Sequence, residues 1–560
     1  MTFDLIIRHG TVVDGTGRKR FRADVGIRGG QVAEIGELGA AQAAETIDAR
    51  DRVVSPGFVD IHTHYDAQIV WDRMLSVSPW HGITTVVMGN CGYSVAPTRG
   101  DHRHFILRTL AKVEGMSIDA LEAGLGERWE FESFPEYLDA IERRGVAVNV
   151  AAYIGHSPVR TVVMGEQSTE RTATADEIDQ MKVIVREAME AGALGFATSK
   201  SLTHVGFGDR PVPSRAADLA ELKALASVLG DMGAGVLQAT IGPGLFFAEL
   251  ADLARATRRP VTWTALLASM LGRGSHKMML QQTADQNRQG LTIVPQVSCR
   301  PISFDFHFGE PYGFESLPLF KQVSAADTPG KMKIFQDAAF RKSLREACKS
   351  QMSGPFHDPW ARMWVSWCPQ DPALEERTLA EVSAERGVDP VDFMLDLALA
   401  SELRARFRLA LSNYDENEVA EILPDPNTVL CVSDAGAHAS QTCDACYSTH
   451  LLGRWVRERR AFELEEAIRM LTSRPADVVG LRDRGRLAVG APADVVVFDP
   501  QTVGATRTRR VWDLPAGSDR LISDAIGIDA VIVNGTTIRR AGRDTVDPAG
   551  ALPGKLLRAR

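Results

Sequence analysis

Eight short apolar segments in the middle of this 560-residue chain alternate with longer segments of helical periodicity. In the helical segments apolar residues recur every three to four positions, as in residues 175–191 and 216–232. Alternating strands and helices favour a parallel sheet, and eight such units predict a closed barrel with its chemistry at the C-terminal strand ends. The apolar segments are residues 54–66, 84–88, 146–154, 192–198, 235–239, 260–264, 292–297 and 428–433.

Segments rich in β-branched residues and in Gly or Asp turns occupy both ends of the chain. Residues 5–18 and 24–36 have the pattern of hairpins, and residues 529–543 repeat the first of them in length and turn placement. We therefore expect about the first 54 residues to form a small antiparallel sheet. We also expect the two ends of the chain to pair, because the termini of a domain are often close together.

The predicted fold class is α/β: a (β/α)8 TIM-like barrel with a small β-sandwich domain formed by both chain termini. Residues 1–54 and 477–560 are assigned to the β domain and residues 55–476 to the barrel. An aromatic-rich insertion near residues 300–367 does not fit a plain strand–helix unit. It is either a lid that shapes an apolar substrate pocket or an extra helical layer packed on the barrel. Its aromatic residues are Phe304, Phe306, Phe308, Tyr312, Phe314, Phe320, Phe356, Trp360, Trp364 and Trp367.

Charge and composition exclude several classes of protein. A formal net charge of -9 argues against a nucleic-acid partner, since phosphate contacts need a clustered basic surface. No apolar run approaches the roughly 20 residues of a membrane-spanning helix, and the start of the chain lacks the pattern of a signal peptide. We predict a cytoplasmic protein with no membrane partner. The seven scattered cysteines predict reduced thiols, and Cys443 and Cys446 have metal or redox spacing without a second pair to complete a structural zinc site.

Two histidines, His62 and His64, end the first apolar segment. Because alternate residues of a strand point to the same side, both imidazoles face one way at the strand end, where they can share a metal ion. The alternative is that one of them is a hydrogen-bonded core histidine.

Two further residues follow predicted strands and can complete a metal site. Asp434 comes directly after the segment 428–433, and a carboxylate there can bind a metal and take a proton from its water. The alternative for Asp434 is a helix cap. Cys91 lies just past the segment 84–88 and is either a thiolate ligand or a small buried residue at a tight turn.

Several motifs, spread in the same order over almost the whole chain, resemble the amidohydrolase superfamily. The branch that they resemble most is the N-acyl-D-amino-acid deacylases, also called D-aminoacylases. The motifs are Pro56-Gly-Phe-Val-Asp-Ile-His-Thr-His-Tyr-Asp66, Gly89-Asn-Cys-Gly92, Ile154-Gly-His-Ser-Pro-Val-Arg160, Gly192-Ala-Leu-Gly195, Ser433-Asp434 and Gly485-Arg-Leu-Ala-Val-Gly-Ala-Pro-Ala-Asp-Val-Val-Val-Phe-Asp499.

The resemblance implies a metal-dependent barrel enzyme that hydrolyses an amide bond. By motif match, His62, His64 and Asp434 take the places of metal ligands, and Cys91 takes the place of the deacylases' cysteine ligand. The implied mechanism is attack by metal-bound hydroxide on the acyl carbonyl. Asp434 is then the general acid/base, which accepts the proton of the water and delivers it to the leaving amine.

The sequence departs from this family at strands five and six. In the deacylases each of these strands ends in a ligand histidine, whereas Thr240 and Ala265 stand at the matching places here. We therefore expect one zinc ion per chain, or a rebuilt site. His276 lies shortly after strand six. Lys200, after strand four, has three interpretations: a carboxylated bridging ligand, an anchor for a substrate carboxylate, or a solvated loop cation.

Further polar residues near predicted strand ends are candidates for substrate binding. His156, His204 and His438 can orient substrate or relay protons, or else make structural hydrogen bonds. Arg160 and Arg300 can pair a substrate carboxylate in bidentate fashion, or else form ordinary salt bridges.

The sequence thus predicts a zinc-dependent hydrolase of an N-acyl amino acid or a similar amide with an apolar group. Its partner is a small-molecule substrate, and a homo-oligomer is compatible with such a barrel. One alternative keeps the barrel and metal but acts on a cyclic amide, an ester or another carbonyl substrate. Another is a non-catalytic barrel that serves as a binding module, motivated by the two absent histidines.

Overall fold

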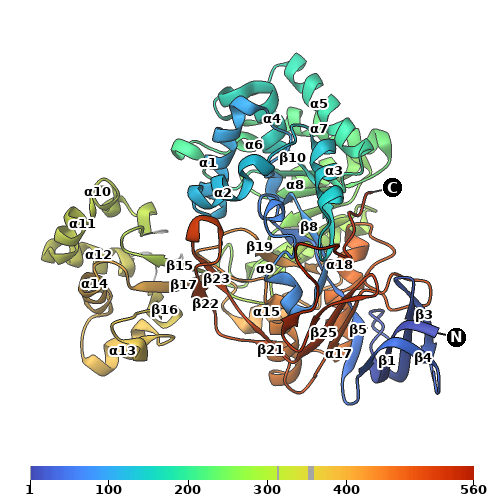
Figure 1. Cartoon of the computed structure of the whole chain (residues 1–560). Coiled ribbons are helices and arrows are strands. Elements are labelled where there is room, and N and C mark those ends of the chain that lie inside the picture. The colour runs from blue at the N-terminus through green and yellow to red at the C-terminus, as the bar shows by residue number, and fades with distance from the viewer. Residues whose placement is uncertain (1, 312–313, 351–357, 560) are drawn as a thin grey trace. The chain divides into compact units, whose positions relative to one another are not determined.

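A computed structural model describes residues 2–311, 314–350 and 358–559 of the chain (Figure 1). Its residues fall into two compact units. The first comprises Met1–Leu266, Lys277–Cys299 and Ala420–Arg560, and the second Leu267–His276 and Arg300–Val419.

Parallel strands form the centre of the first unit. They make three ladders, in the orders β6-β8-β9, β10-β11-β12-β13-β14-β18 and β19-β7. Because β6 and β7, β9 and β10, and β18 and β19 follow one another along the chain, the ladders join into a closed ring of eight strand positions within the described residues. The strands are β6 (Phe58–Asp60), β7 (His62–Thr63), β8 (Ile83–Met88), β9 (Asn149–Ala152), β10 (Ile154–Gly155), β11 (Gly195–Ser199), β12 (Val236–Thr240), β13 (Val261–Thr264), β14 (Ile293–Val297), β18 (Val429–Leu430) and β19 (Val432–Ala435).

Amphipathic helices between the strands bury one face. Helix α5 (Ala175–Glu190) begins with a capping box in which Thr174 and Glu177 satisfy each other's backbone N–H groups. Asp218 caps the N-terminus of helix α7 (Leu219–Met232), because its side chain accepts a hydrogen bond from the backbone N–H of Glu221 at 2.8 Å. Both helices were predicted from periodicity and are confirmed to within three residues. Further helices of this unit are α1 (Arg103–Glu114), α3 (Phe134–Arg144), α4 (His156–Met164), α8 (Phe247–Thr257) and α17 (Leu464–Leu471).

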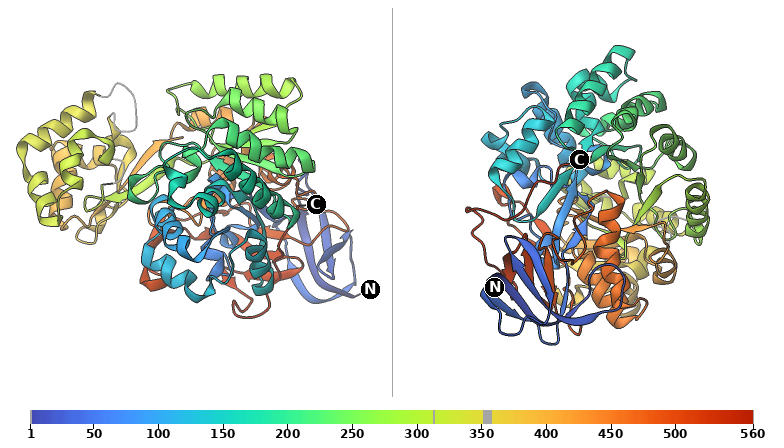
Figure 2. Two further views of the ribbon diagram at one scale, coloured as in Figure 1. Left: turned by 90° about the horizontal axis from the view of Figure 1, so that it is seen from above. Right: turned by 90° about the vertical axis from the view of Figure 1, so that its right-hand side faces the viewer.

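Both ends of the chain contribute to one sheet, which has nine strands among the described residues. Figure 2 shows the blue N-terminal and red C-terminal strands side by side. They join where β5 pairs antiparallel with β20, with Val54 opposite Val497. A shared apolar core that includes Leu5, Val54 and Ile532 packs on this sheet. The strands are β1 (Thr2–Val12), β2 (Phe21–Arg28), β3 (Gln31–Gly36), β4 (Gln42–Asp48), β5 (Val53–Pro56), β20 (Val495–Phe498), β25 (Ile528–Val533), β26 (Thr536–Arg540) and β27 (Arg543–Asp544).

One detail of the predicted β domain is wrong. Strands β4 and β5 pair with β1 in parallel, so the first 54 residues are not a purely antiparallel sheet. The expected pairing of the two ends is present, through β5 and β20, which lie between the two echoing hairpins in the sheet. Turn residues predict hairpins, but they carry no information on which distant strand takes the free edge of β1.

The last described residues lie along the start of the barrel strands. The backbone N–H of Gly554 donates to Val146 O at 2.8 Å, and that of Ala559 donates to Gly192 O at 3.0 Å. Arg558 binds Asp139 and Glu142 of α3 at 2.9 and 2.8 Å. This tail therefore binds to the N-terminal face of the barrel, where contacts serve stability rather than catalysis.

The second unit has a core of its own. It contains a three-stranded antiparallel sheet in the order β15-β17-β16 within the described residues. Its elements are β15 (Ile302–His307), β16 (Met363–Trp367), β17 (Arg406–Ser412), α11 (Thr328–Gln336), α12 (Ala338–Ser350), α13 (Leu379–Arg386) and α14 (Pro390–Ala400).

Four of the ten aromatic residues noted in the sequence, Phe306, Phe308, Phe314 and Phe320, are buried in this core, and Trp360 packs against it. Phe308, Phe314 and Phe320 are fully buried, and their rings contact one another and Phe335 at centroid distances of 5.1–5.9 Å. Trp364 and Trp367 are half-buried, while Tyr312 and Phe356 lie outside the described residues. The aromatic richness is therefore explained by core packing and does not by itself indicate a substrate pocket.

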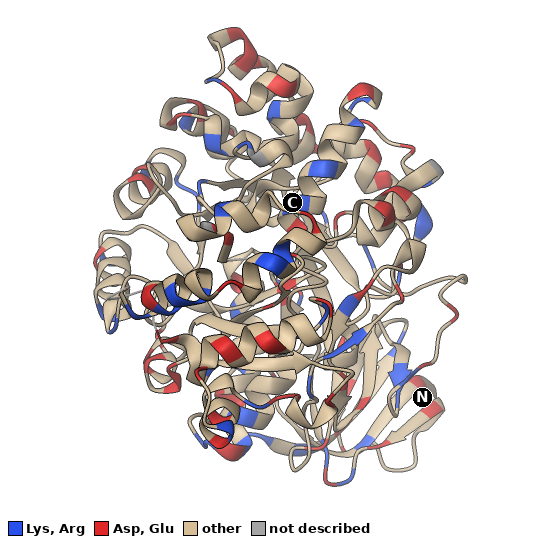
Figure 3. Ribbon diagram, turned by 90° about the vertical axis from the view of Figure 1, so that its left-hand side faces the viewer, with Lys and Arg blue, Asp and Glu red and all other residues tan. Residues whose placement is uncertain are grey.

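Other expectations have mixed outcomes. All seven cysteines lie within the described ranges and are free thiols, as expected. No helix in the described part of the chain is long and apolar enough to cross a membrane. Basic and acidic segments are interspersed on the side that Figure 3 shows. The domain boundaries at residues 54 and 476 remain predictions.

Candidate metal centre

His62 and His64 lie at the C-terminal end of the first barrel strand. His62 is in β7, which pairs in parallel with β19, and its ring is completely buried. His64 is 8% exposed, and the two ring centroids are 5.3 Å apart. The strand therefore presents both imidazoles to one small volume.

Cys91 reaches the same volume from a tight turn after β8. The residue has a left-handed backbone, with φ of 57°, and glycines at 89 and 92 flank this turn. Its backbone N–H donates to Gln238 Oε1 at 2.8 Å, which holds the turn against the neighbouring strand β12. Its Sγ lies 3.6 Å from His62 Nε2.

Asp434 completes the group from β19. Its Oδ1 is 3.1 Å from His62 Nε2 and 3.7 Å from His64 Nε2. The Asp434 side chain is 29% exposed, against 1% for His62 and 6% for His64, so it is the member of the group that water and substrate reach most easily.

The donor set fits a tetrahedral zinc ion. Such an ion, with bonds of about 2.0–2.3 Å, holds its donor atoms roughly 3.3–3.8 Å apart. The separations of 3.6 and 3.7 Å fall within this range, and that of 3.1 Å lies just below it. The ligand atoms of His62, His64 and Cys91 also lie within 4.8 Å of one another. Two imidazoles, a thiolate and a carboxylate are the ligand types that zinc prefers.

Electrostatics favour the ligating form of the two acids. Burial acts to raise the pKa of the Cys91 thiol, but the imidazoles of His62 and His64 outweigh it and lower this pKa to about 7. Burial would also raise the pKa of Asp434, but hydrogen bonds from the same two rings hold it well below its usual value. The carboxylate is thus the favoured state of Asp434, and the thiolate of Cys91 is accessible near neutral pH.

The far nitrogen of each imidazole has a polar neighbour that the sequence analysis missed. Gln296 Oε1 of β14 lies at hydrogen-bond distance, 2.5 Å, from His62 Nδ1, whereas Glu114 Oε1 of α1 lies at ion-pair distance, 3.3 Å, from His64 Nδ1 without hydrogen-bond geometry. Partners of this kind fix the ring orientation of metal-binding histidines. A polar residue inside the apolar segment 292–297 was a usable signal for Gln296, whereas nothing local in the sequence distinguishes Glu114.

The ends of strands five and six carry no histidine, as expected from the sequence. Thr240 ends β12, and Ala265 follows β13; each is 8% exposed. His276 belongs to the second unit, where its Nδ1 lies 3.6 Å from Glu418.

Lys200 is buried, with 8% of its surface exposed, so it is not a solvated loop cation. Its ammonium donates to the backbone oxygens of Arg215, at 3.1 Å, and Ala217. Burial, then the nearby charge of Arg160, lowers the pKa of Lys200 to about 8. These bonds engage the ammonium with backbone, and its carboxylation and its anchoring of substrate stay untested predictions.

His156 and Arg160 share one buried carboxylate, Glu221. His156 Nε2 is 2.9 Å from Glu221 Oε1 and its Nδ1 is 2.8 Å from Thr198 Oγ1, so both ring nitrogens are engaged. The Arg160 guanidinium binds Glu221 and is completely buried. This arrangement favours a structural role for both residues over their predicted role in substrate binding.

His204 and His438 lie near the four donors. The pKa of His204 falls to about 3, first through desolvation and then through the neighbouring His438 and His64. Ser199 Oγ is 2.7 Å from His204 Nδ1, and the Tyr93 ring packs edge-on against this imidazole. A neutral His204 suits hydrogen bonding to substrate. Arg300 belongs to the second unit, and its predicted role remains untested.

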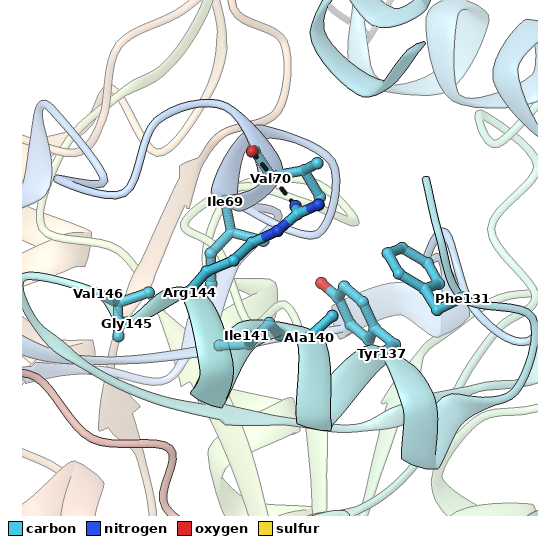
Figure 4. Close-up of a pocket in the computed structure, with 9 residues that line it drawn as sticks. All are labelled: Ile69, Val70, Phe131, Tyr137, Ala140, Ile141, Arg144, Gly145 and Val146. Carbon is cyan, nitrogen blue, oxygen red and sulfur yellow. Dashed lines mark hydrogen bonds between the residues drawn. The ribbon is translucent and has the colours of Figure 1, made fainter. Parts of the chain in front are cut away.

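A separate hollow beside α3 has a different character (Figure 4). Its described lining is apolar apart from Tyr137 and Arg144, and Arg144 donates to Val70 O at 3.5 Å. Since no histidine, cysteine or carboxylate is among these lining residues, this hollow is not a second metal site.

A parallel barrel with metal ligands gathered at its C-terminal strand ends defines a metal-dependent barrel enzyme. Comparison with known proteins gives the family: residues 45–539 match the amidohydrolase family model, and the chain belongs to this family. The predicted resemblance, fold class and enzyme class are thereby confirmed.

Relatives are similar over nearly the full chain. An N-acyl-D-glutamate deacylase of Alcaligenes xylosoxydans xylosoxydans is 31% identical, covering 99% of this chain and 96% of its own. A D-aminoacylase of the same organism is 30% identical, with coverages of 98% and 97%.

Solved structures agree in fold. An N-acyl-D-glutamate deacylase from Bordetella bronchiseptica, in complex with zinc and a phosphonate inhibitor, has a TM-score of 0.67 at 28% identity and full coverage of both chains. A D-aminoacylase whose binuclear metal centre has been studied has a TM-score of 0.68 at 27% identity, covering 99% of this chain and 100% of its own.

Proposed function

We propose that this protein hydrolyses the amide bond of N-acyl amino acids with one zinc ion held by His62, His64 and Cys91, with Asp434 beside it as the general acid/base. The observation that carries the proposal is the convergence of these three ligand atoms within 4.8 Å of one another, with Asp434 Oδ1 3.1 and 3.7 Å from the two imidazoles. The names of the full-length relatives, deacylases of N-acyl-D-glutamate and N-acyl-D-aspartate, support the substrate class.

The residues divide the chemistry between them. A zinc ion bound here supplies Lewis-acid chemistry that polarises the acyl carbonyl and activates water. Asp434 is the exposed member of the group, and its carboxylate is ionised near neutral pH. It is therefore placed to accept the proton of the attacking water and to deliver it to the leaving amine. His204 donates or accepts a hydrogen bond as a neutral imidazole and helps to orient the substrate.

The absence of histidine at two strand ends supports a single metal ion. Thr240 and Ala265 stand where the deacylases are expected to carry ligands, and an alanine side chain cannot bind a metal. This chain would then differ from the D-aminoacylase with a binuclear centre. The binding-module alternative was motivated by an incomplete site, and four convergent donors remove that motive.

Metal content and substrate preference test the proposal. The protein is purified without chelator, its zinc is measured by elemental analysis, and hydrolysis is assayed on N-acyl amino acids of both hands, cyclic amides and esters. His62→Ala should lose zinc and activity together. The matched control His9→Ala, at an exposed histidine of the β domain, should keep both.

Each alternative result has a meaning. Preferred cleavage of cyclic amides or esters would assign the same centre to another substrate class. A metal-free, inactive wild type would contradict the proposal. The cytoplasmic location and the homo-oligomer stay predictions.

A further inference from the structure

Three polar side chains in the barrel interior form one hydrogen-bonded chain behind the candidate metal centre. Gln238, Thr264 and Gln296 come from the adjacent strands β12, β13 and β14. Thr264 and Gln296 are direct partners in the parallel register, which brings their side chains together. Gln238 and Gln296 are completely buried, so their polar atoms depend on protein partners.

This series of hydrogen bonds connects two candidate metal ligands, Cys91 and His62. The backbone N–H of Cys91 donates to Gln238 Oε1 at 2.8 Å, and Gln238 Nε2 donates to Thr264 Oγ1 at 3.1 Å. Thr264 Oγ1 then donates to Gln296 Oε1 at 2.8 Å. Gln296 Oε1 and Thr264 Oγ1 lie 2.5 and 3.2 Å from His62 Nδ1.

The direction of this chain is set at its first bond. A backbone N–H can only donate, so it selects the oxygen of the Gln238 amide and turns the amide nitrogen toward Thr264. The threonine hydroxyl accepts from Gln238 and donates its single proton to Gln296 Oε1 at 2.8 Å, which is nearer than His62 Nδ1 at 3.2 Å. Gln296 consequently presents its oxygen, and not its nitrogen, to His62.

This direction determines the tautomer of His62. Facing an oxygen acceptor, Nδ1 carries a proton, so in the neutral ring that metal binding requires it is Nε2 that has the free lone pair. Nε2 is the atom that lies 3.1 Å from Asp434 and 3.6 Å from Cys91, at the proposed metal position. A reversed Gln296 amide would put the proton on Nε2 and block ligation.

We infer that Gln238, Thr264 and Gln296 are positioning residues that hold His62 in its metal-binding tautomer. Strands five and six lack ligand histidines, but through Gln238 and Thr264 they orient His62 and so contribute indirectly to binding one metal ion. This inference rests on the proposed function only in requiring a metal ion at His62.

Zinc affinity of the folded protein tests the inference without any assay of activity. Partners that orient a metal-binding histidine typically contribute 10–100-fold to metal affinity. Thr264→Val is nearly isosteric and removes only the hydroxyl that directs Gln296. It should weaken zinc binding by about 10–100-fold in competition with a chromophoric chelator, whereas Thr264→Ser should stay within about threefold of wild type.

A matched control lies on the same strand. Thr262 is completely buried, and its hydroxyl donates to Val294 O at 2.9 Å. This bond is not part of the hydrogen-bonded series of Gln238, Thr264 and Gln296. Thr262→Val should therefore leave zinc affinity unchanged even if it lowers thermal stability.

At Gln296, a change to Glu keeps the acceptor and should retain zinc affinity, and a change to Leu should lower zinc affinity about 10–100-fold.

Cobalt substitution gives a second readout. The thiolate-to-cobalt absorption band should persist in Thr264→Val at saturating metal, because Cys91 itself is unchanged. Should this variant fail to fold, Gln296→Asn carries the same expected loss, since it shortens the amide by one methylene.

The outcomes separate this inference from the proposed function. Equal zinc affinity in wild type, Thr264→Val and Gln296→Leu overturns the positioning role and leaves the hydrolase proposal standing. Zinc binding with the expected variant pattern, but no cleavage of N-acyl amino acids, supports the positioning role and overturns the substrate class. A wild type that binds no zinc overturns both.

Discussion

Protonation of Glu221 should remove a defined part of the protein's stability. The carboxylate is 1% exposed and lies between His156 and Arg160. Burial acts to raise its pKa, but the hydrogen bonds and charges of these partners outweigh it and lower the pKa from 4.5 to about 2. Burial lowers the pKa of His156, so the lasting positive charge of the cluster is that of Arg160.

The sign and size of the effect follow from linkage. Because the folded pKa is depressed, the unfolded chain binds the proton more tightly, and the stabilisation is present above pH 4.5 and lost as pH falls toward 2. The difference between 4.5 and about 2 corresponds to roughly 3 kcal/mol in full. One pH unit below the unfolded pKa, about 1 kcal/mol of this should already be lost.

Glu221→Gln isolates this contribution. Near neutral pH the variant leaves the Arg160 charge buried without a counter-charge, which typically costs about 3–5 kcal/mol. It has no carboxyl group to titrate at this position, so the stability difference from wild type should narrow in acid. Urea midpoints of both proteins, measured from about pH 7 to about pH 3.5, give this difference directly.

The control is Glu187→Gln, at an exposed glutamate on α5. The free energy of unfolding of this control variant should equal that of wild type at every pH. If the difference in free energy of unfolding between wild type and Glu221→Gln stays constant or widens in acid, the reasoning is refuted. It would show that Arg160 does not depend on the ionised carboxylate.

Three further predictions concern the metal centre and the second unit. Cys91→Ser should weaken zinc binding and abolish the thiolate-to-cobalt absorption band, because serine is a far poorer zinc ligand than a thiolate; an unchanged band would exclude Cys91 as a ligand. Asp434→Asn should lower kcat by about 10²–10⁴-fold on the preferred N-acyl amino acid while the far-UV spectrum is unchanged, and wild-type kcat would exclude a proton-transfer role. Phe308→Ala, in the core of the second unit, should cost about 3–5 kcal/mol and make that unit susceptible to limited proteolysis, whereas truncation of the exposed Leu202 should do neither.

The barrel and its candidate ligands were predictable because their signals are local. The strand that carries His62 and His64 shows these candidate ligands within a few residues, and Asp434 follows its own strand directly. Strand ends of a parallel barrel meet at one face, so separate local motifs could be combined into one site without knowledge of contacts.

The residues that contact the candidate ligand histidines, Gln296 and Glu114, were not predictable in the same way. Gln296 lies 234 positions from His62 in sequence, and their contact depends on the register of neighbouring strands. Glu114 is on a helix whose sequence gives no reason to face His64. A glutamine or glutamate carries no local mark of its partner, so only the folded arrangement identifies these contacts.

Arg160 shows why two interpretations stayed open at the sequence level. Beside a predicted strand end, an arginine suggests a site for a substrate carboxylate, yet the carboxylate that it binds belongs to Glu221, 61 positions away. The second unit gave a similar difficulty, since its phenylalanines have the composition of a substrate pocket and the packing of a core. Composition does not distinguish these two environments.

The junction of β5 with β20 also bears on how the protein is made. Roughly 440 residues separate Pro56 from Val495, so a ribosome adding about 5–20 residues per second completes the partner strand roughly 20–90 s later. Throughout that interval the edge of β5 is an open template for any other strand. Nascent and prematurely terminated chains of this protein should therefore be prone to association with one another, and chaperone demand during synthesis should fall only when the last tenth of the chain emerges.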